Sequence, residues 1–274
     1  MVVFTGRKIA YFLLCLLLLW LTLIGGVYLF QEAIIFQGQI LPEDYAFELG
    51  GDFEELDLNP PGTARLHALY FRSPFPSRGA ILYLHGNADN LQRWGQYQGE
   101  LTRRGYDVLM IDYRGYGKSR GEIGTEACYR DARRAYDWLA ERFAPDRITL
   151  YGRSLGTSIA AELASRVAAQ RLILETPFDN LRHSLELTIP ALWLPWPLRH
   201  PFAVDRYLPQ IDCPITIFHG TRDWVVRYRS ARALQPLLRE RDRFYTIPGG
   251  GHRNLADYAV FQEGLDEVLG KGFD

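Results

Sequence analysis

Ser154 has the surroundings in this sequence that most clearly suggest chemistry. It lies in the pentapeptide GRSLG, between Gly152 and Gly156, after strand-forming residues and before an alanine-rich segment. A serine hydroxyl is a weak nucleophile that must be exposed and close to a base. A sharp strand-to-helix turn presents it in this way, and small residues two positions before and after it let the turn close. Because Gly-x-Ser-x-Gly also occurs by chance, the alternative is a glycine-rich turn with an incidental serine.

The base that such a serine needs is best supplied by His252, in the sequence PGGGHRN. Imidazole has an ordinary pKa of about 6.5, so it can accept and return a proton at neutral pH. His252 follows the last predicted strand, on a glycine-rich loop that can bring the ring over the serine. A surface or capping histidine is the alternative. We expect His85 and His219, which precede glycines at strand ends, to hydrogen-bond within those turns.

An acid is expected in the sequence HGTRDWVV, where Asp223 follows the penultimate strand. A carboxylate there could accept the second imidazole N–H, fix the tautomer and stabilise the cation. The chain order Ser154, Asp223, His252 is the order found in α/β hydrolases. Three other carboxylates compete for this role, and the first of them ends the strand after the serine-bearing helix: Glu175, Asp179 and Asp205.

The oxyanion of an acyl-transfer reaction needs two preorganised N–H donors. One is expected to be the backbone N–H of Leu155, at the start of a helix whose dipole favours negative charge. The other is expected in the sequence HGNADN, as the backbone N–H of Asn87.

Strands and helices alternate along the rest of the chain. Two strands joined by a Pro-Gly turn are predicted within 48–74. Further strands are predicted over 79–86, 106–117, 147–152, 171–177, 213–220 and 242–250. Helices are predicted over 90–104, 125–143 (with Thr125 as N-cap), 155–169 and 228–240, and from about 254 onward. Apolar strands alternating with helices indicate a mainly parallel sheet buried on both faces, in one domain. Ligands bind such sheets beyond the carboxyl ends of the strands, where the polar and glycine-rich motifs of this sequence converge.

The segment 177–210 is too long for a simple connection between a strand and a helix. It is rich in proline and contains Trp193 and Trp196. A lid-like insertion that walls an acyl pocket or touches a bilayer is one interpretation, since Trp favours the membrane interface. Irregular packing over the edge of the sheet is the other.

An uncharged, strongly apolar run extends over residues 9–30. As a helix it would span about 33 Å, which matches the core of a bilayer. A cleaved signal peptide is the alternative, but its apolar region is usually shorter and no Ala-x-Ala site follows. We therefore expect a membrane anchor over 1–35 and a catalytic domain over 36–274.

The charges that flank this run predict its orientation. Arg7 and Lys8 precede it, Glu32 and Glu43 follow it, and the next basic residue is Arg65. By the positive-inside rule, the N-terminus is cytoplasmic and the catalytic domain extracytoplasmic, which means periplasmic in a bacterium.

Composition excludes several classes of function. The net charge of −1 argues against nucleic-acid binding, which needs a strongly basic face. Cys15, Cys128 and Cys213 show no spacing typical of a disulfide framework or a metal site. The sequence DYRGYGKSRG lacks the phosphate-loop pattern, and we expect its Asp112 and Arg114 to tie down a loop.

Taken together, HGNADN, DYRGYGKSRGE, YGRSLGTS, HGTRDWVV and GGGHRN resemble the motifs of the α/β-hydrolase superfamily, in order and spacing. They are most similar to its single-pass, membrane-anchored serine hydrolases, a branch that includes protein depalmitoylases. The resemblance covers about residues 50–270. It implies an eight-stranded sheet, a triad of Ser154, Asp223 and His252, and oxyanion donors at Asn87 and Leu155.

The function expected from these observations is hydrolysis of a carboxylic ester or thioester through an acyl-enzyme on Ser154, with no metal or organic cofactor. The partners expected are a lipid-like acyl substrate and a membrane. A peptidase or amidase could use the same triad, and a non-catalytic anchored module could keep the same fold.

Overall fold

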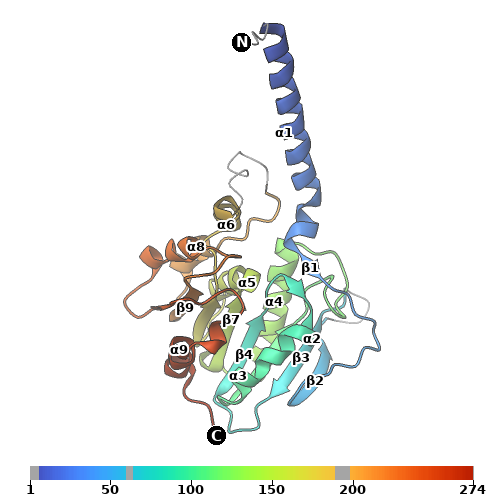
Figure 1. Ribbon diagram of the computed structural model, residues 1–274. Helices are drawn as coiled ribbons and strands as arrows, with labels where there is room; N and C mark the ends of the chain where they lie inside the picture. Colours follow the sequence, from blue (N-terminus) through green and yellow to red (C-terminus); the bar gives the residue numbers. More distant parts are fainter. Residues whose placement is uncertain (1–5, 60–63, 189–197, 274) are drawn as a thin grey trace.

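The computed structural model describes residues 6–59, 64–188 and 198–273. A long helix, α1 (Gly6–Ile35), projects from an α/β body whose central sheet has helices on both faces (Figure 1). The strands of this sheet are β2 (Asp52–Asp57), β3 (His67–Arg72), β4 (Gly79–Leu84), β6 (Tyr106–Ile111), β7 (Ile148–Arg153), β8 (Arg171–Glu175), β9 (Ile215–Gly220) and β10 (Arg243–Ile247).

Within the described ranges the sheet is eight-stranded, in the order β10-β9-β8-β7-β4-β6-β3-β2. Strand β3 runs antiparallel to its neighbours β2 and β6, and every other neighbouring pair is parallel. The predicted eight-stranded, mostly parallel sheet is therefore confirmed. Its first two predicted strands pair as β2 and β3, and the Pro-Gly turn predicted between them lies outside the described residues.

The central strand β4 shows why its sequence is apolar at every position. Ala80, Leu82 and Leu84 point into one core, whereas Ile81 and Tyr83 point into the other. Helices α4 and α5 cover the first face of the sheet, and α2, α3 and α9 cover the second. A strand buried on both faces cannot alternate apolar with polar residues, since both sets of side chains leave water.

The helices of the body are short in several places. They are α2 (Leu91–Trp94), α3 (Gln98–Thr102), α4 (Thr125–Ala140), α5 (Leu155–Ala164), α6 (Leu181–Thr188), α7 (Val204–Tyr207), α8 (Tyr228–Arg232) and α9 (Ala259–Leu269). Turns of 3₁₀ helix occur at η1 (Gly95–Tyr97), η2 (Pro145–Arg147), η4 (Leu208–Gln210), η5 (Gln235–Leu237) and η6 (Leu255–Asp257).

Three helix predictions needed correction. The helix expected over 90–104 is divided into α2, η1 and α3. The helix expected over 228–240 is α8 followed by η5, because Pro236 cannot continue an α-helix. Thr125 is the first helical residue of α4 rather than its N-cap, and its hydroxyl contacts His200 Nδ1 at 3.3 Å.

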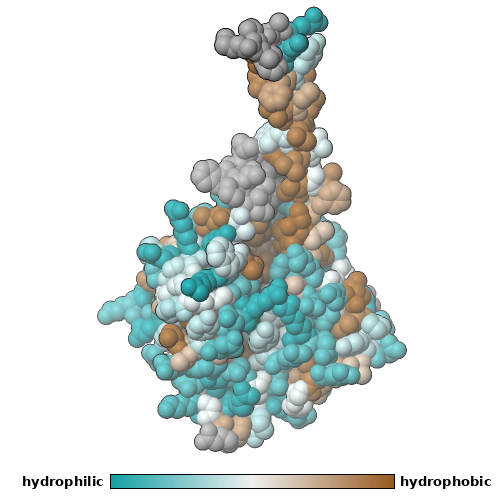
Figure 2. Space-filling view, viewed as in Figure 1, coloured by the Kyte–Doolittle hydropathy of each residue, from teal (hydrophilic) through white to brown (hydrophobic). Residues whose placement is uncertain are grey.

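Among the helices of the described ranges, α1 alone has the length and the apolar composition needed to cross a membrane. Figure 2 shows its apolar surface rising from a mostly hydrophilic body. At the other end of the helix, Gln31 and Ile35 are buried against the body. The division into an anchor, a catalytic domain and an insertion over 177–210 stays a prediction.

Candidate active site

Ser154 lies on the tight turn between β7 and α5, with φ 53° and ψ −117°. A positive φ is costly for a residue with a side chain, and such strain is typical of functional positions. The two flanking glycines make the turn possible. A Cβ on Gly156 would lie 1.9 Å from the Leu84 carbonyl oxygen, and a Cβ on Gly152 would lie 2.4 Å from the Gly156 carbonyl oxygen.

His252 lies over this turn, on the loop between β10 and η6. Its Nε2 is 3.0 Å from Ser154 Oγ, and its Nδ1 is 2.7 Å from Asp223 Oδ2. These three side chains come from three separate loops at the carboxyl ends of β7, β9 and β10. The structure therefore brings together the three residues that the sequence singled out, in one hydrogen-bonded chain.

The carboxylate of Asp223 is fully buried, and both of its oxygens have partners. Oδ1 accepts hydrogen bonds from the backbone N–H groups of Val225 at 2.9 Å and Val226 at 2.8 Å. Oδ2 faces His252. The backbone of its own loop thus orients this carboxylate toward the imidazole.

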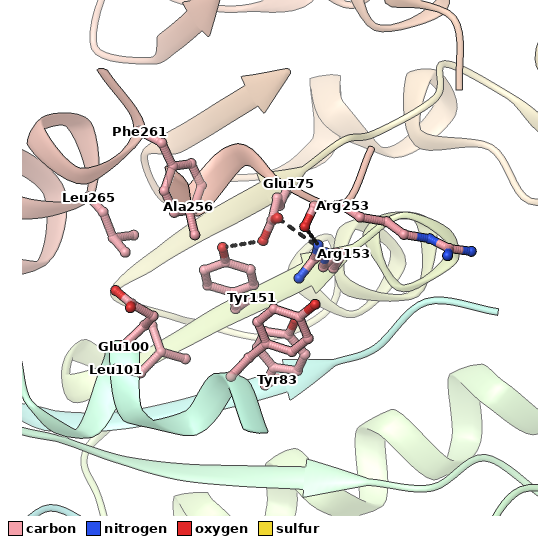
Figure 3. A pocket seen from close by; sticks show the side chains of 11 residues that line it. Tyr83, Glu100, Leu101, Tyr151, Arg153, Glu175, Arg253, Ala256, Phe261 and Leu265 are labelled. Atoms are coloured by element: carbon pink, nitrogen blue, oxygen red, sulfur yellow. Dashed lines mark hydrogen bonds and ion pairs between the residues drawn. The ribbon is translucent and has the colours of Figure 1, made fainter. Parts of the chain in front are cut away.

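The competing carboxylates are engaged elsewhere. Figure 3 shows Glu175 between Tyr151 and Arg153: the Tyr151 hydroxyl donates to Oε2 at 2.7 Å, and Arg153 Nε lies 3.1 Å from Oε1. Asp179 accepts from the Ser230 hydroxyl, and Asp205 accepts from the Asn180 amide at 2.8 Å. None of the three forms the bond to His252 Nδ1 that Asp223 forms.

The two predicted oxyanion donors border Ser154. Leu155 is the first residue of α5, so the helix itself does not use its N–H. Asn87 follows β4, and its carbonyl accepts hydrogen bonds from the Gln37 N–H at 2.9 Å and the Tyr116 hydroxyl at 2.8 Å. Asn87 and Leu155 line the same pocket as Ser154.

That pocket is mainly apolar. Besides Ser154 and the two predicted donors, its apolar lining consists of Ile34, Ile35, Phe178, Leu181, Leu185, Val225 and Val226. Ser154 is only 8% exposed, so a substrate must reach it through such an opening. The predicted pocket residues Trp193 and Trp196 lie outside the described residues.

The sequence did not reveal that the chain after α1 lies beside the loop that carries Asn87. Residues Gln37–Gly38 form strand β1, which pairs in parallel with β5 (Ala88–Asp89), next to Asn87. A ladder of two residues has no periodicity, and its partners are far apart in the chain. The apolar run over residues 9–30 precedes this segment in the sequence. Such a run predicts a membrane-spanning helix and does not predict the contacts of the residues that follow it.

His85 and His219 form hydrogen bonds within the turns at their strand ends, as expected. His85 Nδ1 lies 2.7 Å from the Gly86 carbonyl oxygen, and His219 Nε2 lies 3.0 Å from the Val226 carbonyl oxygen. Burial lowers the pKa of His219 to about 4, which keeps this ring neutral at physiological pH. It therefore adds no positive charge beside Asp223.

The loop over 112–121 has a structural role, as expected. Asp112 is fully buried and accepts a hydrogen bond from the Leu91 N–H at 3.1 Å. Arg114 forms two hydrogen bonds of 2.9 Å to the Asp131 carboxylate. Cys15, Cys128 and Cys213 are free thiols, so the structure contains no Cys128–Cys213 bridge.

Comparisons with known proteins identify the class. Residues 76–202 match the family model described as "Serine aminopeptidase, S33". The chain is 33% identical over 202 residues to a lysophosphatidylserine lipase, ABHD12, of Danio rerio, covering 61% of this chain and 49% of the lipase. It is 31% identical over 222 residues to the human alpha/beta hydrolase domain-containing protein 17C, covering 75% of this chain and 62% of that protein.

A structural comparison gives the same fold. An esterase from Pyrococcus furiosus superposes with a TM-score of 0.68 at 17% identity, covering 86% of this chain and 96% of the esterase. The chain belongs to the α/β-hydrolase superfamily, as its motifs predicted. Its alignments with these two curated relatives cover between about half and two thirds of their lengths.

Proposed function

We propose that this protein is a membrane-anchored lipase or esterase that cleaves a lipid-like carboxylic ester or thioester, with Ser154 as nucleophile, His252 as base and Asp223 as orienting acid. The observation that carries the proposal is the continuous chain of hydrogen bonds from Ser154 Oγ through His252 to Asp223, at the edge of an apolar pocket.

In acylation, His252 Nε2 takes the hydroxyl proton as Ser154 Oγ attacks the carbonyl carbon. The imidazolium that forms is stabilised by Asp223, which also holds Nδ1 protonated. The negative charge on the carbonyl oxygen is met by the N–H groups of Leu155 and Asn87, and losing one such donor costs about 3 kcal/mol of barrier. When the tetrahedral intermediate collapses, Nε2 gives its proton to the departing alcohol or thiol.

Deacylation repeats these steps with water. His252 Nε2 takes a proton from the water that attacks the acyl-enzyme, and returns it to Ser154 Oγ as the acid leaves. Each step is a proton transfer, an addition to the carbonyl, or the collapse of the tetrahedral intermediate with loss of the leaving group. These side chains and peptide N–H groups, with the substrate and water, supply every group that the steps need.

The apolar pocket supports a substrate with an apolar acyl group, because burial of such a group is favourable by about 0.8 kcal/mol for each CH₂. The relatives named as a lipase and an esterase agree with this substrate class. The family description "Serine aminopeptidase" favours amide cleavage as a second candidate.

The substrate class can be tested with the full-length protein in detergent micelles. Its turnover is measured on p-nitrophenyl esters from acetate to palmitate, on acyl thioesters, and on an amino-acid p-nitroanilide, with Ser154→Ala as background. We expect turnover of esters or thioesters and none of the anilide. Turnover of the anilide alone would replace this proposal with a peptidase.

We further propose that α1 crosses the membrane with its N-terminus in the cytoplasm, since Arg7 and Lys8 precede its apolar run. The body over 36–274 then lies outside the cytoplasm, with 177–210 as an insertion over the site. In a bacterial host, a C-terminal alkaline phosphatase fusion should be active, and a C-terminal green fluorescent protein fusion dark. The opposite pattern would reverse the orientation.

A further inference from the structure

The chain that leaves α1 is hydrogen-bonded to the loop that carries Asn87. We call residues 31–41 the exit segment. Asn87 Nδ2 donates to the Ile35 carbonyl at 3.1 Å, and the Gln37 N–H donates to the Asn87 carbonyl at 2.9 Å. The pairing of β1 with β5 continues this contact by two more residues. The end of α1 and the loop that carries Asn87 therefore form one unit.

The exit segment also contacts other parts of the body. Gln39 and Gly117 are joined by a hydrogen bond of 2.8 Å, from the Gly117 N–H to the Gln39 carbonyl. The Gln31 side chain accepts a hydrogen bond from the Arg199 N–H at 2.8 Å. The ring of Phe36 lies edge-on to that of His200, with 5.1 Å between their centroids. These contacts fix the last turn of α1 against the site.

The last turn of α1 supplies one wall of the pocket at Ser154. Ile34 and Ile35 line this pocket together with apolar residues of α6 and of the loops that follow β8 and β9. Ile35 is 6% exposed, whereas Ile34 is 49% exposed. Ile34 thus stands at the mouth of the pocket, and Ile35 lies deeper.

An apolar groove on α1 reaches the same residue. It is lined by Leu19, Thr22, Leu23, Gly26, Val27, Phe30 and Ile34. Because Ile34 borders both the groove and the pocket, an apolar surface continues from the membrane-crossing part of α1 to the nucleophile. An acyl chain could follow this surface without entering water, which would cost about 0.8 kcal/mol for each exposed CH₂.

We propose that the exit segment is part of the active site, with Ile34 and Ile35 as residues that determine acyl-chain specificity. The inference rests on the proposed function, since it assigns the wall that the substrate's acyl chain contacts. The ligand is a single long apolar chain, which lies along α1 with its carbonyl carbon at Ser154. The hydrogen bond between Asn87 and Ile35 ties this wall to the loop that carries the oxyanion donor.

The test uses the full-length protein in lipid vesicles and measures kcat/KM on p-nitrophenyl esters from acetate to palmitate. Ile34→Trp fills the mouth of the pocket, so we expect the palmitate-to-acetate ratio of kcat/KM to fall at least about tenfold, the usual effect of a changed fit in an apolar pocket. Ile34→Ala widens the mouth and should shift the preferred chain length upward. Leu29→Trp is the matched control, since Leu29 is exposed on the same helix and lines neither the groove nor the pocket.

The outcomes separate this inference from the proposed function. If the parent protein cleaves esters and both Ile34 variants keep its chain-length profile, the assignment of the wall is wrong. If Leu29→Trp changes the profile as much as Ile34→Trp, a general effect on α1 is responsible and the inference is again wrong. If the parent protein cleaves no ester or thioester, the proposed function itself fails.

Discussion

Asp223 and His252 are joined by a hydrogen bond of 2.7 Å, between Oδ2 of the carboxylate and Nδ1 of the ring. The other carboxylate oxygen is already held by two backbone N–H groups of the same loop. The carboxylate therefore has a fixed direction before any substrate binds. Such preorganisation means that no reorientation is needed when the imidazole becomes charged.

This relationship predicts which carboxylate matters for activity. Asp223→Asn should lower kcat by about 10⁴-fold, because an amide in this position favours the wrong imidazole tautomer. Glu175→Gln is the matched control, and it should retain the activity of the parent protein. The measurement is kcat on a short ester. Loss of activity in the Glu175 variant alone would assign the acid to Glu175.

The same control variant carries a separate prediction about stability. Glu175 and Arg153 form an ion pair in which both side chains are 5% exposed. Removing one charge leaves the other buried without its partner, which typically costs about 3–5 kcal/mol. Glu175→Gln should therefore clearly lower the urea midpoint of unfolding. In activity the order is reversed, and Asp223→Asn should lose far more than Glu175→Gln. An unchanged midpoint would contradict this prediction, and it would mean that water or another side chain compensates the charge of Arg153 in the variant.

The turn at Ser154 predicts an intolerance of any side chain at Gly156. Gly156→Ala places a Cβ 1.9 Å from the Leu84 carbonyl oxygen, so the turn must open. Overpacking of this kind costs about 1–3 kcal/mol, and here it also displaces Ser154. We expect loss of both stability and probe labelling. Gly50→Ala is the control, since nothing lies within 4 Å of a Cβ there; equal behaviour of the two variants would contradict the account of the turn.

His219 predicts a dependence of stability on pH. Burial lowers its pKa to about 4, although Asp223 Oδ2 lies 3.5 Å from its Nε2. Between this value and the ordinary histidine pKa of about 6.5, the unfolded chain binds a proton that the folded protein excludes. The contribution to stability is therefore complete above about pH 6.5 and is lost as the pH falls, by up to about 1.4 kcal/mol per pH unit.

The check is urea unfolding at pH 7 and pH 5. The parent protein should lose more free energy of unfolding between these values than His219→Gln does, because the variant has no group to protonate at this position. The variant should be less stable at pH 7, since it changes the contact of His219 with the Val226 carbonyl. Parallel pH profiles would show that His219 is not the group responsible.

Much of this site could be predicted from sequence because parallel strands bring their carboxyl ends to one edge. Ser154, Asp223 and His252 each follow a strand, and each has the residue type that its place in the chain order requires. The choice between Asp223 and Glu175 could be ranked but not decided from sequence. The decision depends on Arg153 and Tyr151, whose side chains bind the Glu175 carboxylate in the folded protein.

The exit segment could not be predicted from the sequence. Its contact between Ile35 and Asn87 joins residues 52 positions apart, and on the side of the exit segment it uses only a backbone carbonyl, which every residue possesses. The composition of residues 31–41 therefore does not predict their contact with the loop that carries Asn87. The division of the helix expected over 228–240 was foreseeable, in contrast, because Pro236 is visible in the sequence.

The central claim is that Ser154 is the nucleophile, and covalent labelling tests it most directly. The full-length protein is treated with a fluorophosphonate, and the modified residue is identified by mass spectrometry. Ser165→Ala, in the residue that follows α5, serves as control. We predict a single adduct on Ser154, unchanged in Ser165→Ala and absent in Ser154→Ala. An adduct that persists in Ser154→Ala, or that maps to another residue in the parent protein, would contradict the account.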